Sequence, residues 1–125
     1  MESPKILILE DEGPIRGMLA QKFSLIGFTV FEAGTGEEAL LIAQKEKPDV
    51  ITTDIVMYPM DGTTFIKRLR ESGPWGARVP CYVLSNQRDP ELITQLRTIG
   101  ATDYINKAET PIDAVAEKIK GSLKK

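Results

Sequence analysis

Polar side chains that could carry out chemistry follow several short apolar runs of the sequence. An acidic triplet at residues 10–12 follows the first run, and Asp54, Ser85 and Lys107 each follow a later one. Neighbouring carboxylates repel one another unless they take up a proton or a hard cation, and an all-oxygen site suits Mg²⁺ better than zinc. Lys107 and the Ser85 hydroxyl could then hold a phosphoryl group. Asp54 would be the nucleophile that becomes an acyl phosphate.

The elements that must position these residues are predicted by an alternation of β-rich runs and stretches of helical period, which is typical of parallel βαβ units. Strands are expected at residues 5–9, 29–32, 50–53, 81–84 and 103–105. The carboxyl ends of parallel strands lie at one edge of an open sheet, where ligands bind. Because neighbouring strands lie about 4.8 Å apart, adjacent first and third strands would bring Glu10, Asp11 and Asp54 close together.

Three of the segments between these strands carry apolar residues at helical spacing. These residues are Ile15, Met18, Leu19 and Phe23, then Leu92, Leu96 and Ile99, then Ile112, Val115, Ala116, Ile119 and Leu123. Asp89-Pro90 and Thr110-Pro111 are typical helix starts, with a side-chain acceptor before a proline at the first helical position. Glycines that fit left-handed positions after helices are Gly27, Gly73 and Gly100.

Composition excludes several classes of function. The chain has 125 residues, which favours one domain. It has no histidine and a single cysteine, so it can form neither a catalytic triad with histidine nor an internal disulfide. The net charge of −2, without a long basic run, argues against nucleic-acid binding. The apolar runs are too short for a membrane span or a signal peptide, and we expect a reducing, cytoplasmic setting.

Each polar residue also has an ordinary structural explanation. Asp11 alone would be interpreted as a helix cap, Asp54 as a turn residue before Pro59, Ser85 as a cap and Lys107 as a solvated lysine. The functional interpretation depends on their occurring together, with one cation and one hydroxyl facing several anions.

The residues resemble the receiver domain of two-component response regulators from end to end. The motifs that carry the resemblance are residues 6–12, 48–54, 60–62, 84–85 and 100–107. The resemblance implies one receiver domain over residues 1–125. It also implies a doubly wound α/β fold of the flavodoxin-like (βα)5 type, with a five-stranded parallel sheet in the order 2-1-3-4-5.

In this family the aspartate corresponding to Asp54 accepts phosphate from the phosphohistidine of a histidine kinase or phosphotransfer protein. Ser85 and Lys107 would hold the phosphoryl group, and the domain would catalyse only its own phosphorylation and dephosphorylation. The implied Mg²⁺ ligands, with Mn²⁺ as an alternative ion, are Glu10, Asp11, Asp54 and the backbone carbonyl of Val56.

The resemblance further implies a switch in which Ser85 moves inward and Tyr104 moves with it. The face of the fourth helix, fifth strand and fifth helix would then contact a downstream protein or output domain. A phosphorylation-dependent homodimer is compatible with this arrangement, as is either a stand-alone chain or a receiver within a longer regulator.

Three positions depart from the family pattern. Tyr58 occupies the usual place of a proline, so we expect a differently shaped loop over the site. Ala108 replaces the proline that usually follows the lysine in a cis peptide, and we expect a trans bond because a cis bond to alanine costs about 3 kcal/mol. Asn86 is larger than the usual residue and would slow phosphotransfer.

Two positions, Val56 and Gln87, tune the rate at which water removes the phosphate in this family. An apolar Val56 cannot orient an attacking water, so we expect a long-lived phosphorylated state.

Two other classes of function compete with the phosphorylated switch. One is a receiver-like interaction module that works without phosphorylation, which the residues Tyr58, Asn86 and Ala108 favour. The other is a flavodoxin-like cofactor binder, which the acidic triplet at residues 10–12 disfavours because it would repel a phosphate. An aspartyl phosphatase would need a second aspartate where Val56 stands.

Overall fold

Strands and helices alternate along residues 3–123, the part of the chain that the computed structural model describes. The strands are β1 Lys5–Leu9, β2 Thr29–Ala33, β3 Val50–Thr53, β4 Cys81–Ser85 and β5 Asp103–Asn106. The helices are α1 Gly13–Leu25, α2 Gly36–Glu46, α3 Gly62–Arg70, α4 Pro90–Thr98 and α5 Ile112–Ser122. All strand pairs are parallel, in the order β2-β1-β3-β4-β5. The predicted doubly wound α/β fold is therefore confirmed, with β2, β4 and β5 each ending one residue later than expected.

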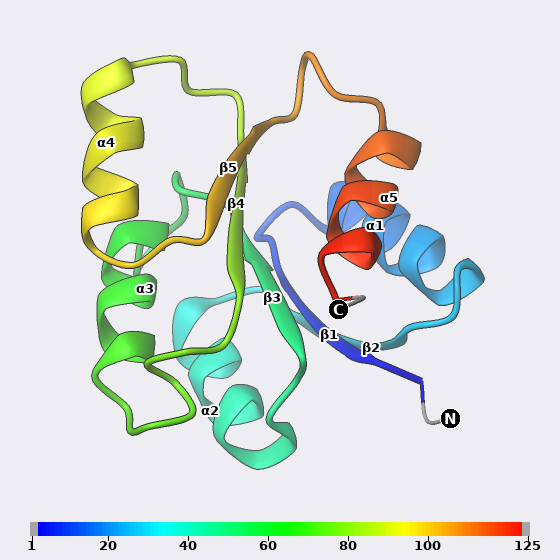
Figure 1. The fold of residues 1–125 in the computed structure, drawn as a ribbon, viewed down its shortest axis with the longest axis horizontal. Coiled ribbons are helices and arrows are strands. Elements are labelled where there is room, and N and C mark those ends of the chain that lie inside the picture. Colours follow the sequence, from blue (N-terminus) through cyan, green and yellow to red (C-terminus); the bar gives the residue numbers. More distant parts are fainter. Residues whose placement is uncertain (1–2, 124–125) are drawn as a thin grey trace.

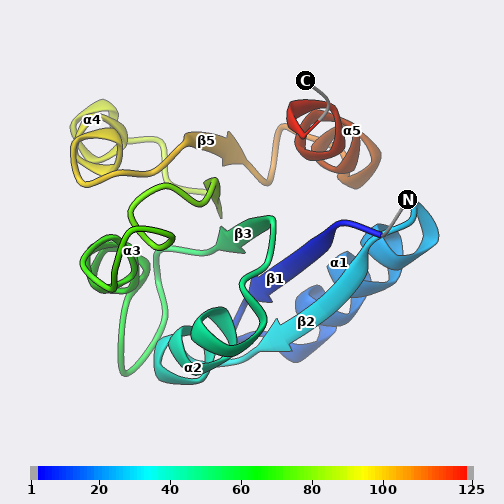
Figure 2. The same ribbon diagram turned by 60° about the horizontal axis from the view of Figure 1, so that its bottom comes forward.

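The helices cover both faces of the sheet, with α1 and α5 on one side and α2, α3 and α4 on the other (Figures 1 and 2). Successive side chains of a strand point to opposite faces. Ile6 and Ile8 accordingly pack with α1 and α5, whereas Leu7 and Leu9 pack with the other three helices. The buried, apolar β1 therefore forms the centre of two cores and fixes the position of the residues that follow it.

The predicted apolar faces of the helices are largely confirmed, with one exception on α1. Leu19 and Phe23 are buried, and the ring of Phe23 meets that of Phe28 edge to face. Met18, which belongs to the predicted apolar row, is 58% exposed. Its neighbour Leu19 is buried, whereas Met18 lines an open pocket between α1 and α5.

Of the two predicted helix starts, one is confirmed and one is wrong. Asp89 caps α4, because its carboxylate accepts a hydrogen bond from the backbone N–H of Glu91. Thr110 does not cap α5: the residue before its first turn is Pro111, which has no side-chain acceptor. The three predicted left-handed glycines are confirmed, with φ of 106° at Gly27, 135° at Gly73 and 112° at Gly100.

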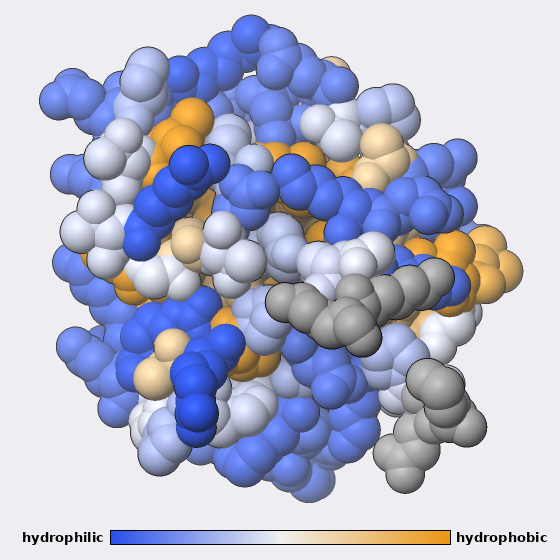
Figure 3. Space-filling model, viewed as in Figure 1, coloured by the Kyte–Doolittle hydropathy of each residue, from blue (hydrophilic) through white to orange (hydrophobic). Residues whose placement is uncertain are grey.

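The face formed by α4, β5 and α5 is largely hydrophilic, with apolar colour showing mainly between the helices (Figure 3).

Among residues 3–123, no helix has the length and apolar character needed to cross a membrane.

Candidate functional site

The predicted site residues lie at the carboxyl edge of the sheet. In the sheet register Leu9 is paired with Thr53 and Ser85 with Asn106. The residues that follow these strands, Glu10, Asp54 and Lys107, therefore emerge beside one another. The loops after β1, β3, β4 and β5 leave the sheet at this same edge (Figure 1).

Lys107 bridges two carboxylates. Its ammonium nitrogen lies 2.9 Å from Asp54 Oδ2 and 3.1 Å from Glu10 Oε1. Burial alone would lower the pKa of Lys107, but the hydrogen bonds to Asp54 and Glu10 outweigh burial and raise that pKa above its ordinary value. Lys107 is therefore a cation beside Asp54 at neutral pH.

Glu10 is turned inward. Its side chain is buried, and its second carboxylate oxygen accepts a hydrogen bond of 3.2 Å from the backbone N–H of Glu12. Burial raises the pKa of Glu10, with the hydrogen bond from Lys107 opposing that rise. Asp11, one residue later, is exposed.

Of the three carboxylates predicted to lie close together, Glu10 and Asp54 meet at the Lys107 ammonium, and Asp11 is exposed. Within residues 3–123 no three acidic side chains lie close enough together to hold a metal ion. The Lys107 ammonium supplies the counter-charge for Glu10 and Asp54.

A pocket of about 400 Å³ opens above this ion-pair network. Asp11, Asp54, Val56, Ser85 and Lys107 line it, whereas Glu10 does not. Glu12, Asn86 and Gln87 complete the lining. Asp11, Asp54 and Val56 line one space, and two carboxylates with a backbone carbonyl are a donor set that fits Mg²⁺.

The loop after Asp54 alternates between buried and exposed side chains. Ile55, Met57 and Met60 are buried, whereas Val56 and Tyr58 are 63% and 85% exposed. The buried members hold the loop against the core and leave Val56 at the pocket. The Tyr58–Pro59 peptide bond is cis.

Asp54 itself is held by the start of that loop. Its Oδ1 accepts a hydrogen bond of 2.6 Å from the backbone N–H of Ile55, and its Oδ2 faces Lys107. Both carboxylate oxygens therefore have fixed directions, which is the preorganisation that a nucleophile needs.

Ser85 and Tyr104 are linked directly. Ser85 is buried at the end of β4, and its carbonyl oxygen accepts a hydrogen bond of 3.1 Å from the Tyr104 hydroxyl. The same hydroxyl donates to the carbonyl of Gln87. Burial is the main reason that the pKa of Tyr104 is raised. The two residues predicted to switch together are therefore in contact through the backbone of β4.

The expected trans bond between Lys107 and Ala108 is confirmed, because the only cis peptide within residues 3–123 is Tyr58–Pro59.

One residue beside the site escapes sequence reasoning. The Arg16 guanidinium on α1 donates a hydrogen bond of 2.7 Å to the carbonyl oxygen of Glu10 and lies 3.4 Å from the carboxylate of Glu32. Arg16 thereby ties α1 to the ends of β1 and β2. No motif or spacing in the sequence marks it, since these partners meet only in the fold.

The fold and this edge of the sheet define an open α/β domain with an acidic, lysine-bridged site, and comparisons with known proteins agree. The family model of the response regulator receiver domain matches residues 6–119. The probable transcriptional regulator ycf27 of Porphyridium aerugineum is 38% identical over 112 residues, which make up 89% of this chain and 45% of that protein.

Solved structures are similar as well. The chemotaxis protein CheY4 of Vibrio cholerae superposes with a TM-score of 0.90 at 29% identity, over 97% of this chain and 99% of that one. The BeF3-activated N-terminal receiver domain of Klebsiella pneumoniae RstA gives a TM-score of 0.86 at 25% identity, over 97% of this chain and 99% of that one.

The chain belongs to the response regulator receiver family. Members of this family are signalling domains of two-component systems rather than classical enzymes, and they act with histidine kinases and output domains. The chain spans 45% of the length of the ycf27 relative.

Proposed function

We propose that this chain is a phosphorylation-activated receiver of a two-component phosphorelay, acting in the cytoplasm as a single domain over residues 1–125. Its Asp54 accepts a phosphoryl group from the phosphohistidine of a histidine kinase or phosphotransfer protein. The observation that carries this proposal is the bridge from Lys107 to Asp54 at the floor of an open pocket.

Glu10, Asp11, Asp54 and the backbone carbonyl of Val56 would hold Mg²⁺, or Mn²⁺ in its place. The ion would neutralise charge on the incoming phosphoryl oxygens. Glu10, which the resemblance counts among the ligands, supports the site through its contact with Lys107.

Asp54, Lys107 and Ser85 have separate roles in phosphoryl transfer. A carboxylate oxygen of Asp54 forms the bond to phosphorus as the bond from phosphorus to the histidine nitrogen breaks. Lys107 pairs with the phosphoryl oxygens, and the Ser85 hydroxyl donates a hydrogen bond to them. The domain thus catalyses only its own phosphorylation and, with water as acceptor, its own dephosphorylation.

The signal leaves the site through Ser85 and Tyr104. When Ser85 turns toward the phosphoryl group, the hydrogen bond between its carbonyl and Tyr104 changes, and Tyr104 is a half-buried residue of β5 that packs against the core beneath α4. A switch of this kind biases a bistable element. The face of α4, β5 and α5 then contacts a downstream protein or output domain, or a second copy of the chain. The BeF3-activated state named for the Klebsiella receiver supports such a transition.

Phosphorylation is tested by incubating the protein with acetyl phosphate, with and without Mg²⁺, and weighing it intact. We expect one phosphoryl group to be added, and the addition to require both Mg²⁺ and Asp54. Asp54→Asn should remain unmodified, whereas Glu37→Gln, which alters an exposed carboxylate on α2, should react like the wild type.

A second candidate function is an interaction module that is never phosphorylated, and it is favoured by Asn86, which lines the pocket wall. Absence of modification in the wild type, together with absence of Mg²⁺ binding, would support this second candidate and contradict the first.

A further inference from the structure

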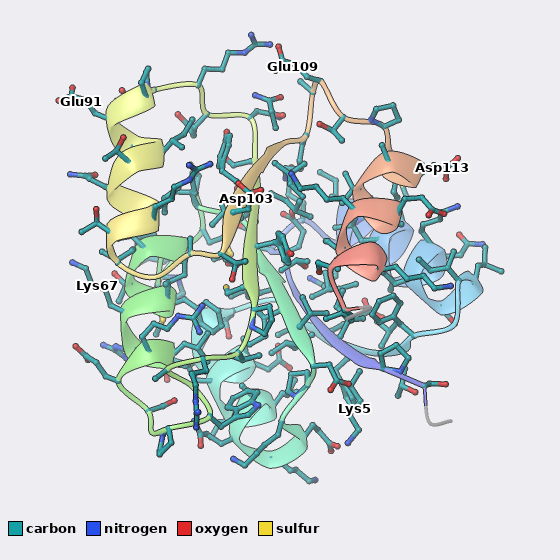
Figure 4. All side chains as sticks on the ribbon, in the orientation of Figure 1. Lys5, Lys67, Glu91, Asp103, Glu109 and Asp113 are labelled. Atoms are coloured by element: carbon teal, nitrogen blue, oxygen red, sulfur yellow. The ribbon has the colours of Figure 1, made fainter. Side chains whose placement is uncertain are left out.

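The turn that follows β5 is organised by one side chain. Asn106 is the last residue of β5, and its Oδ1 accepts hydrogen bonds of 2.9 Å from the backbone N–H of Ala108 and 3.1 Å from that of Glu109. Glu109 lies at the crest of the loop that joins β5 to α5 (Figure 4). The two N–H groups directly after Lys107 are therefore both directed at Asn106.

The backbone of Lys107 is held on its other side by β4. The N–H of Lys107 donates a hydrogen bond of 3.0 Å to the carbonyl of Ser85, and Asn106 is the register partner of Ser85. Lys107 thus lies between a strand pair before it and a side-chain-bonded turn after it. Ser85 and Lys107, the two residues that face the phosphoryl group, are both fixed relative to Asn106.

This anchoring matters because of the nature of lysine. Its four-carbon stem is flexible, so the position of the ammonium group depends on how firmly the main chain is held. The Lys107 ammonium must lie within hydrogen-bonding reach of both Asp54 and Glu10. A turn that is free to move would spread the ammonium over a wider volume.

The arrangement also depends on the residue after the lysine. Asn106 needs an N–H at position 108, and a proline would have none. Ala108 supplies this donor through a trans peptide. The departure from the family pattern at Ala108 and the presence of Asn106 therefore form one structural unit.

We propose that Asn106 is a positioning residue for phosphoryl transfer, which holds Lys107 in place through the N–H groups of Ala108 and Glu109. The proposal rests on the proposed function of Asp54. Asn106 makes no contact with the reacting atoms and acts only through Lys107.

The test measures initial rates of phosphorylation by acetyl phosphate in the full chain, at varied donor and varied Mg²⁺ concentrations. Asn106→Ala should lower the maximal rate about tenfold, the order expected for a modest misplacement of a reacting group. The Mg²⁺ concentration for half-maximal rate should stay unchanged, because Asn106 touches none of the residues expected to bind the ion. Asn106→Asp keeps the accepting oxygen and should restore the maximal rate to within about twofold.

Controls separate positioning from folding. Thr110→Ala changes the same loop at a side chain that makes no hydrogen bond within residues 3–123, and it should react like the wild type. Thermal unfolding of each variant shows whether a slow variant is also unfolded. If Asn106→Ala does not fold, Asn106→Ser takes its place, because the shorter serine side chain brings its acceptor oxygen less far toward the N–H groups of Ala108 and Glu109. The rate of phosphorylation of Asn106→Ser then tests the positioning role.

The outcomes are distinct. A wild-type rate for a folded Asn106→Ala would overturn the positioning role while leaving the proposed function intact. Recovery of stability without recovery of rate in Asn106→Asp would also overturn it, because Asn106 would then only shape the turn. A wild-type protein that accepts no phosphate would instead refute the proposed function itself.

Discussion

Close approach of Gly62 to the candidate phosphoacceptor shows how a single residue shapes the site. The N–H of Gly62 donates a hydrogen bond of 2.8 Å to the carbonyl of Ile55. A Cβ atom on Gly62 would lie 2.0 Å from the carbonyl oxygen of Asp54, far inside van der Waals contact. Only glycine lets α3 begin this near to Asp54.

Gly62→Ala should therefore destabilise the fold by about 3 kcal/mol or more, as for strong overpacking against backbone. Gly17→Ala is the matched control, since a Cβ on Gly17 of α1 meets no atom within 4 Å. This control should stabilise the protein by about 0.5–1 kcal/mol through helix propensity. Denaturant unfolding midpoints measure both changes, and equal effects of the two substitutions would contradict the steric argument.

A second prediction concerns Val56 and the lifetime of the phosphorylated state. Its apolar side chain is exposed at the pocket and cannot orient an attacking water. Val56→Asn should speed loss of phosphate about tenfold, less than the hundredfold or more of a full general base. The decay of phosphorylated protein, followed by intact mass after removal of the donor, gives the rate. An unchanged rate would show that water reaches the phosphate by another route.

At the scale of elements, Arg70 fastens three segments together. From the end of α3 its guanidinium donates hydrogen bonds to the carbonyl oxygens of Gly76, Val79 and Gly100. The pair of bonds to Gly100 measures 3.0 Å and 2.7 Å. The long connection between α3 and β4 and the turn after α4 are thereby tied to one side chain.

Arg70→Lys keeps the charge but loses the planar fork of donors, and it should reduce the free energy of unfolding by about 2 kcal/mol. Arg68→Lys, an exposed change on the same helix, should leave that free energy within about 0.5 kcal/mol of the wild type. Chemical denaturation of the two variants provides the comparison. If Arg68→Lys lowered the free energy of unfolding as much as Arg70→Lys, helix α3 would be sensitive to any replacement of arginine by lysine, and the argument from the hydrogen bonds of Arg70 would fail.

At the scale of the whole molecule, the edge strand β5 connects the helical layers on the two faces of the sheet. Asp103 of β5 lies 3.1 Å from Arg97 of α4 and 3.0 Å from Lys118 of α5 (Figure 4). Burial works to raise the pKa of Asp103, but hydrogen bonds from Lys118 and from the N–H of Tyr104 outweigh burial and lower that pKa.

This lowered pKa determines the sign of a pH dependence. A carboxyl whose pKa is lower in the folded state stabilises the fold above its unfolded pKa, and this stabilisation is lost as the pH falls through the folded value. Asp103→Asn should cost about 0.5–1 kcal/mol near neutral pH, as for partly exposed ion pairs. The difference from the wild type should shrink below pH 3.8, the ordinary pKa of aspartate. Unfolding curves over the acid range test this, and a difference independent of pH would contradict it.

Local pattern in the sequence was sufficient to predict the strands and helices and the approximate location of the site. β-rich runs of three to five residues predict the strands, and β1 and β3 match the structure at both ends. The parallel arrangement then places Asp54, Ser85 and Lys107 at one edge. These properties follow from residues that are near neighbours in the chain, whose periodicity needs no knowledge of distant partners.

Tertiary structure alone decided which residues of the site contact one another. Glu10 and Asp54 share the ammonium group of Lys107, which lies 97 residues beyond Glu10 in the chain. Met18 lies outside the core, and Thr110 is no cap because α5 begins after Pro111. Each outcome depends on which distant atoms compete for the same charge, surface or hydrogen bond, and that competition is settled only when the chain is folded.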